Sequence, residues 1–126
     1  MLRIKHFAAQ LFEAKGIDYE IDIENNIRHL KLPMEHRQSV YLIMKEAINN
    51  LVKYADAGKA YIRAESEGQF LKVQVSDDGK GFVYSTVRTG NGIVNMKGRA
   101  DLMGATLQLS SSPGKGTTMI LILKMK

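Results

Sequence analysis

The residues that first suggest chemistry lie in the stretch 76–82, where an aspartate pair is followed by two spaced glycines (Ser-Asp-Asp-Gly-Lys-Gly-Phe). Asp77 follows an alternating apolar run, so its carboxylate is expected to face a cleft from the end of a strand. There it could accept a hydrogen bond from the amino group of a base, while Gly79 and Gly81 let the backbone approach. A fixed Asp77 would favour adenine over guanine by roughly 1–3 kcal/mol, because guanine presents a carbonyl at that place. The alternative is an ordinary Asp-Gly turn that ends a strand.

Two further stretches carry groups that suit phosphate. Gly90-Asn91-Gly92 precedes an expected helix, and free backbone N–H groups together with the helix dipole attract an anion at such a position. The alternative is a plain loop with a glycine at the helix entry. Thr117 closes a Gly-Lys-Gly-Thr stretch over residues 114–117, which predicts a hairpin turn, although its hydroxyl could also donate to a ligand.

A third set of polar residues lies within roughly 60° on one long helix, beside its apolar stripe. Glu46, Asn50 and Lys53 make up this set. The Asn50 carbonyl is a hard oxygen ligand for Mg²⁺, Lys53 offers a point charge to phosphate, and Glu46 could orient or deprotonate a hydroxyl or water. The alternative is a solvated helix edge on which Glu46 contacts Asn50 or Lys53.

The elements that must position these residues follow from hydrophobic periodicity and turn residues. The expected elements, in chain order, are a helix over 2–14 that ends at Gly16, a strand over 17–23, a helix over 35–55, a hairpin of strands 60–64 and 70–75, a loop over 83–90, a helix over 93–103 closed by Gly104, and a hairpin of strands 105–109 and 117–123. So many hairpins argue against a doubly wound parallel sheet. We expect an α+β fold, a two-layer sandwich with helices on one face of a mostly antiparallel mixed sheet.

Composition limits the class of protein. A chain of 126 residues with 44% hydrophobic and 25% charged residues fits one soluble domain. No apolar run is long enough to cross a bilayer and the N-terminus lacks a signal-peptide core, so we expect a cytoplasmic location. The absence of cysteine excludes disulfides and thiolate metal sites. The net charge of +5 is spread along the chain without interleaved aromatics, which argues against nucleic acid.

Four segments in order resemble the histidine-kinase catalytic domains. Residues 45–55 (Lys-Glu-Ala-Ile-Asn-Asn-Leu-Val-Lys-Tyr-Ala) resemble their asparagine box, residues 77–82 their first glycine box, and residues 90–100 their second. Residues 104–118 resemble the segment that closes such domains. The resemblance covers about residues 17–124 and implies the Bergerat ATP-binding fold, shared with type II topoisomerases, mismatch-repair ATPases and heat-shock chaperones.

This resemblance implies roles for individual residues. Asp77 would bind the adenine amine of ATP, Asn50 the Mg²⁺ and Lys53 the phosphates. The four glycines Gly79, Gly81, Gly90 and Gly92 would frame a lid over ATP. Glu46 stands where many sensor kinases carry another asparagine, and a glutamate there is typical of a short-lid subfamily and of hydrolysing relatives, so Glu46 is the predicted catalytic base. Residues 83–89 are too few for a long lid with a phenylalanine box.

A sensor kinase also needs a dimerising helical hairpin with a phospho-accepting histidine, and none of His6, His29 and His36 has that sequence context. We therefore interpret residues 1–14 as the tail of a missing dimerisation helix and residues 15–126 as the catalytic domain.

The predicted function is transfer of the ATP γ-phosphoryl group to a histidine on a separate domain of a two-component kinase, with a response regulator downstream. The isolated domain is expected to be a monomer, and the full-length kinase could be anchored in a membrane. The alternatives are an ATPase with a water held by Glu46, a serine-protein kinase, and a nucleotide-sensing module without phosphotransfer.

Overall fold

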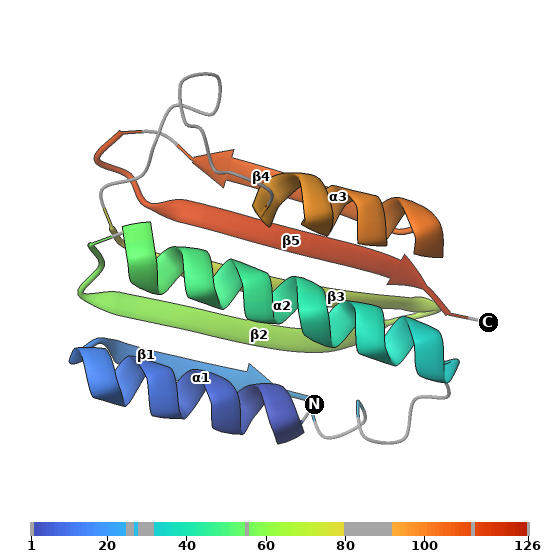
Figure 1. The fold of residues 1–126 in the computed structure, drawn as a ribbon. Helices are drawn as coiled ribbons and strands as arrows, with labels where there is room; N and C mark the ends of the chain where they lie inside the picture. Colours follow the sequence, from blue (N-terminus) through green and yellow to red (C-terminus); the bar gives the residue numbers. More distant parts are fainter. Residues whose placement is uncertain are drawn as a thin grey trace.

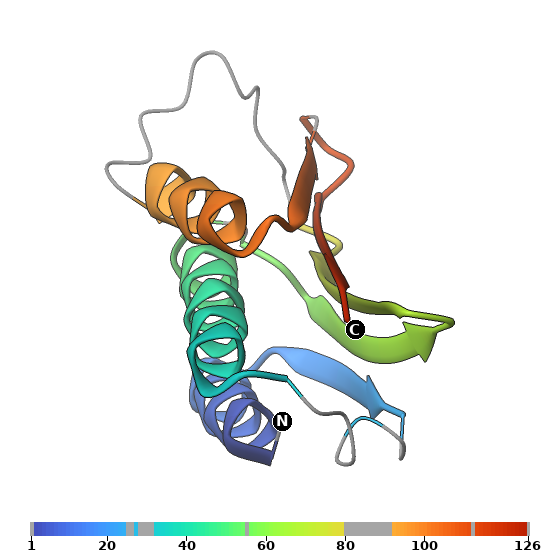
Figure 2. The ribbon, with the colours of Figure 1, turned by 90° about the vertical axis from the view of Figure 1, so that its right-hand side faces the viewer.

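The structure, a computed structural model, describes residues 2–24, 27, 32–54, 56–79, 92–111 and 113–125. Figures 1 and 2 show helices covering one face of a sheet, in two layers. The elements are α1 (Leu2–Lys15), β1 (Asp18–Ile23), α2 (Met34–Tyr54), β2 (Lys59–Glu67), β3 (Phe70–Asp77), α3 (Gly92–Met103), β4 (Thr106–Ser111) and β5 (Thr117–Lys124). The predicted two-layer α+β fold is confirmed. Among the described residues, none of the helices has the length and apolar character needed to cross a membrane.

In the described part of the chain, five strands form one mixed sheet in the order β1-β2-β3-β5-β4. Both predicted hairpins are present, since β2 pairs antiparallel with β3 and β4 with β5. β5 also pairs antiparallel with β3, and β1 runs parallel to β2. The parallel pair requires a long crossover connection. α2 supplies it, because this helix lies between β1 and β2 in the sequence and runs back over one face of the sheet (Figure 1).

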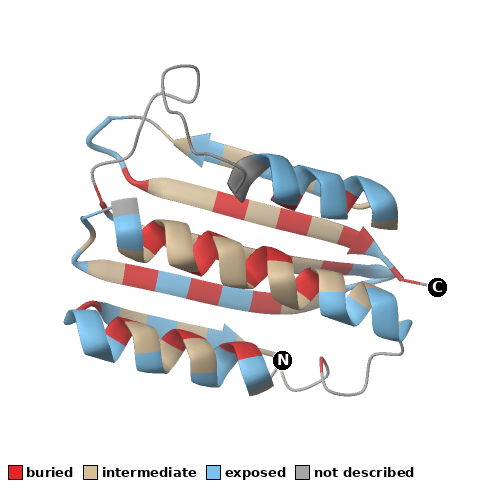
Figure 3. Cartoon of the chain, viewed as in Figure 1, coloured by how far each residue is buried: buried red, intermediate tan, exposed pale blue. Residues whose placement is uncertain are grey.

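The hydrophobic core lies between the helices and the sheet (Figure 3). The apolar stripe predicted for α2 is buried from Val40 to Leu51, whereas Ala55, its last predicted member, lies outside the described residues. Alternate residues of the central strands face it, namely Ala60, Ile62 and Ala64 of β2, Leu71, Val73 and Val75 of β3, and Met119, Leu121 and Leu123 of β5. Burying each such large apolar side chain contributes about 1.5–3 kcal/mol, which holds α2 against β2, β3 and β5.

The first helix belongs to the same core. Ile4, Ala8 and Phe12 of α1 are buried with the core residues of α2 and the sheet. Two cation–π contacts also join α1 to α2. The Arg3 guanidinium lies 4.3 Å from the Tyr41 ring centroid and the Lys45 ammonium 5.5 Å from that of Phe7. The interpretation of residues 1–14 as the tail of a dimerisation helix stays a prediction.

The last helix is short and shallowly packed. α3 starts at Gly92, one residue before the predicted start, and ends at Met103. Gly104 follows it with a φ of +67°, which is typical of the residue after a helix C-terminus. The described side chains of α3 that are buried are Met96 and Ala100, and through them α3 packs beside α2. The helix start that was predicted to receive phosphate therefore stands next to the C-terminal half of α2 (Figure 1).

Candidate functional site

Several of the predicted site residues that the structure describes lie at one end of the sheet. β3 ends at Asp77 and β5 begins at Thr117, and these two residues are cross-strand partners. α2 packs against both β3 and α3, and Figure 1 shows its C-terminal end and the start of α3 at this same end. The carboxylate of Asp77, the hydroxyl of Thr117 and the N-terminus of α3 at Gly92 thus come from three separate segments of the chain.

Asp77 is half-buried, and its environment holds the carboxylate in one orientation. Its Oδ1 accepts a hydrogen bond from the backbone N–H of Gly79 at 2.7 Å, the geometry of an Asx turn. Burial raises the pKa of Asp77 above its ordinary value, backbone hydrogen bonds from Gly79 and Thr117 oppose that rise, and the Asp78 charge adds to it. The half-buried Asp77 carboxylate at this strand end can accept a hydrogen bond from a donor group on a ligand.

Gly116 lies so close to the backbone of Asp77 that it has no room for a side chain. A Cβ at Gly116 would overlap the carbonyl oxygen of Asp77 and lie 3.3 Å from the Cα of Asp78. Its φ of +76° also favours glycine. The sequence interpretation assigned Gly116 only to a hairpin turn. The signal that could have indicated more is the second glycine of Gly-Lys-Gly, which stands directly before the first residue of β5.

The Thr117 side chain is held within the sheet. Its Oγ1 lies 2.8 Å from Oγ of Ser111, and the Ser111 hydroxyl donates to the Gly116 carbonyl at 3.2 Å. Asp77, Thr117 and Ser111 form one row across β3, β5 and β4. The turn over residues 114–116 is confirmed, whereas donation by Thr117 to a ligand stays a prediction.

The helix trio occupies the second half of α2. Glu46 and Asn50 are half-buried and Lys53 is exposed. Among the described residues, Glu46 makes no hydrogen bond or ion pair with Asn50 or Lys53, so the predicted alternative of a Glu46 contact on a solvated edge is not observed. Their assigned roles toward a nucleotide stay predictions.

The glycines of the predicted lid fall partly outside the described residues. Gly81 and Gly90 are outside them, as are the predicted loop over 83–90 and both neighbours of that loop. Gly79 is buried two residues after the end of β3, and Gly92 is the first residue of α3. These two glycines therefore mark the two sides of the described site.

The donor set fits a weakly held hard cation rather than a protein-caged metal. The described residues contain no group of three or more His, Cys, Asp or Glu that could hold an ion. Mg²⁺ usually keeps several waters and takes one or two protein oxygens together with phosphate oxygens. The half-buried amide of Asn50 can supply one such oxygen.

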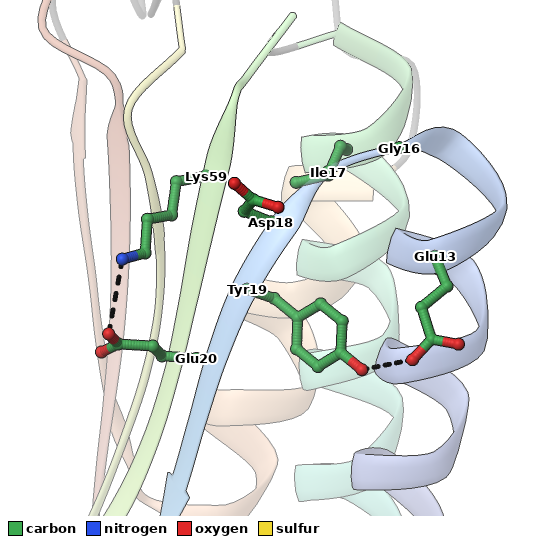
Figure 4. A pocket seen from close by; sticks show the side chains of 7 residues that line it. All are labelled: Glu13, Gly16, Ile17, Asp18, Tyr19, Glu20 and Lys59. Atoms are coloured by element: carbon green, nitrogen blue, oxygen red, sulfur yellow. Dashed lines mark hydrogen bonds and ion pairs between the residues drawn. The ribbon is translucent and has the colours of Figure 1, made fainter.

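A separate open pocket of about 540 Å³ lies at the start of β1 (Figure 4). Its lining includes Tyr19, which donates a hydrogen bond to Glu13, and Lys59, whose ammonium lies 3.4 Å from Glu20. The hydrogen bond to Glu13 raises the pKa of Tyr19, and that to Glu20 raises the pKa of Lys59. The residues that line this pocket include none of the predicted site residues. We therefore do not assign nucleotide binding to it on the basis of its size.

Comparison with known proteins places the chain in a family. Residues 35–126 match the family of histidine kinase-, DNA gyrase B- and HSP90-like ATPases. The chain belongs to this family. The match begins at α2 and contains every predicted site residue, from Glu46 to Thr117. The resemblance inferred from the four sequence boxes is therefore confirmed.

Relatives of this ATPase-family domain are sensor kinases. It is 31% identical over 96 residues to the sensor protein VraS of Staphylococcus saprophyticus, covering 75% of this chain and 28% of VraS. The histidine kinase domain of the blue-light activated kinase EL346 of Erythrobacter litoralis shares its fold with a TM-score of 0.82 at 18% identity, over 97% of this chain and 59% of that one. The Acinetobacter baumannii histidine kinase AdeS gives a TM-score of 0.77 at 18% identity, over 98% and 64%.

Proposed function

We propose that this chain is the ATP-binding catalytic domain of a sensor histidine kinase. The single observation that carries the proposal is Asp77, a half-buried carboxylate at the end of β3. Its side chain accepts backbone hydrogen bonds from Gly79 and Thr117, and its backbone lies against Gly116. A carboxylate held in this way would accept a hydrogen bond from the adenine amine and would leave guanine with an unsatisfied partner.

The remaining groups would act on the phosphates. The start of α3 at Gly92 supplies backbone N–H groups and a positive dipole end, and Lys53 on the neighbouring helix supplies a full charge. Asn50 would hold Mg²⁺ through its amide oxygen, and the bound ion would neutralise charge on the phosphate oxygens. Glu46, one turn before Asn50 on α2, would act as the general base.

The reaction that fits this set is transfer of the γ-phosphoryl group from ATP to an imidazole nitrogen of a histidine on a separate dimerisation domain. A nitrogen–phosphorus bond forms, the bond to the bridging oxygen of ADP breaks, and ADP leaves. The protein contributes positioning and electrostatic stabilisation. The 31% identity to the sensor protein VraS supports a role in a sensor kinase. With that role we propose a response regulator downstream and a cytoplasmic location for the domain. The isolated domain would be a monomer.

Calorimetric titration with ADP, ATP and GTP in Mg²⁺, on wild type and Asp77→Asn, tests the nucleotide site. We expect adenine-selective binding that is lost in the variant. No binding by the folded wild type would contradict the proposal. Incubation with ATP and a histidine-bearing dimerisation domain supplied in trans then tests transfer, with phosphohistidine expected. Phosphate release without an acceptor would favour an ATPase, and binding without either product would favour a sensing module.

A further inference from the structure

A second carboxylate, which the proposed mechanism does not use, holds the end of β3. Oδ1 of Asp78 accepts hydrogen bonds from the backbone N–H groups of Gly58 at 3.0 Å and Lys59 at 2.9 Å. The N–H of Asp78 in turn donates to the Lys59 carbonyl at 3.2 Å. Asp78 and the first residue of β2 therefore close a ring of hydrogen bonds.

The sheet register explains why a side chain is used at this point. Ala60 and Asp77 are the last paired residues of β2 and β3 on this side. Beyond them, two consecutive amides converge on one Asp78 oxygen, and an ionised acceptor makes stronger hydrogen bonds than a neutral one. The Gly58 carbonyl also accepts from the N–H of Asp18 at 3.0 Å, which ties the same connection to β1.

The contacts of Asp78 complete the support around Asp77. On one side, Gly116 fills the space against the Asp77 carbonyl. On the other, Asp78 anchors β3 to residues 58 and 59. The Asp77 side chain itself accepts from the Gly79 N–H, immediately after this anchor. The orientation of the Asp77 carboxylate therefore depends on the position of the backbone at the end of β3, which the hydrogen bonds of Asp78 fix.

We propose that Asp78 is a positioning residue for the nucleotide site, which fixes the backbone from which Asp77 projects by capping the amides of Gly58 and Lys59. The expected effect of Asp78 on nucleotide binding rests on the proposed function of Asp77. The expected effect of Asp78 on the backbone around Asp77 does not require a ligand.

Three variants test the proposal by calorimetric titration with ADP. Asp78→Ala removes both acceptors, while Asp78→Asn keeps a carbonyl oxygen that can receive both N–H groups. Asp18→Ala is the matched control, because it removes one negative charge from the other side of the same connection. We expect Kd to rise about tenfold in Asp78→Ala, because the loss of both hydrogen bonds leaves Asp77 less firmly positioned, and to stay within about threefold of wild type in the other two.

Amide hydrogen exchange without nucleotide provides the second measurement. Asp78→Ala should speed exchange at Gly58, Lys59 and Gly79 but not at the core residue Val73, and Asp78→Asn should restore protection. Unchanged exchange at Gly79 in Asp78→Ala would overturn the proposal, whatever happens to ADP affinity. If the wild type binds no ADP but the exchange pattern changes as expected, the positioning role is supported and the proposed function fails.

Discussion

At the scale of single residues, Asp77 is expected to favour nucleotide binding but to reduce the stability of the fold. Asp77 must keep a charged carboxylate in a half-buried place, and burial is the largest cause of its raised pKa. A carboxyl group whose pKa is higher in the fold than in the unfolded chain contributes stability below its unfolded pKa, and this contribution is lost as pH rises through the folded pKa. The ionised Asp77 therefore lowers the free energy of unfolding at neutral pH.

We expect Asp77→Asn to be at least as stable as wild type at pH 7 while it loses ADP binding. The asparagine keeps an oxygen for the Gly79 N–H and carries no charge to desolvate. Urea unfolding between about pH 3 and pH 7 should show the wild type losing stability relative to the variant as pH rises above the ordinary carboxyl pKa of about 4. Asp101→Asn on the exposed face of α3 serves as the control. A variant less stable than wild type at pH 7 would contradict this assignment.

Gly116 offers a second test at this scale. Gly114→Ala should cost about 1–2 kcal/mol of unfolding free energy, because Gly114 has a φ of +78° but open space around its Cβ position. Gly116→Ala should cost roughly 1–3 kcal/mol more, because the added methyl group meets the Asp77 backbone. Chemical denaturation of both variants measures the difference. Equal losses would show that the close approach at Gly116 is unimportant.

At the scale of elements, α1 belongs to the same hydrophobic core as α2 and the sheet. Phe12 has no exposed surface, and its ring centroid lies 5.7 Å from that of Tyr19 on β1. We expect Phe12→Ala to reduce the free energy of unfolding by about 3–5 kcal/mol. Phe70→Ala, at a residue of β3 that is 45% exposed, should cost less than about 1 kcal/mol. Denaturant titration checks both, and a small effect at Phe12 would mean that α1 detaches easily from the domain.

The elements were also the part of the fold most readily predicted from sequence. The stripe from Val40 to Leu51 repeats at helical spacing, and the alternation of Leu71, Val73 and Val75 marks β3, so local patterns located both elements within about two residues. The parallel pairing of β1 with β2 and the insertion of β5 between β3 and β4 were not predicted. Those pairings join distant segments, and periodicity along one strand carries no information about its partner.

The same distinction holds for the site. Asp77 could be located because its apolar alternation stops there, and the structure places it at the strand end as expected. The Asp78 contacts with residues 58 and 59 could not, because they depend on how the end of α2 is joined to β2. Nor could the clash at Gly116, since it depends on how closely two backbones approach.

At the scale of the whole molecule, nucleotide should act on the folding equilibrium of the entire domain. A ligand that binds only the folded state stabilises it by about 2.7 kcal/mol at a free concentration of 100 times Kd. We therefore expect ADP to raise the thermal midpoint, with GDP giving little shift. Asp77→Asn should show no shift with either nucleotide. An equal shift with GDP would point to phosphate recognition without adenine selectivity.

The contacts between α1 and α2 couple the movements of the two helices. Arg3 on Tyr41 and Phe7 under Lys45 join the helices at two heights, and Glu46 follows Lys45 directly in the chain. A turn or axial shift of α1 must therefore either break both cation–π contacts or carry α2 with it. In the second case the displacement reaches Glu46, Asn50 and Lys53 together, so a movement of α1 would shift the three residues that we propose act on the phosphates and Mg²⁺ of ATP.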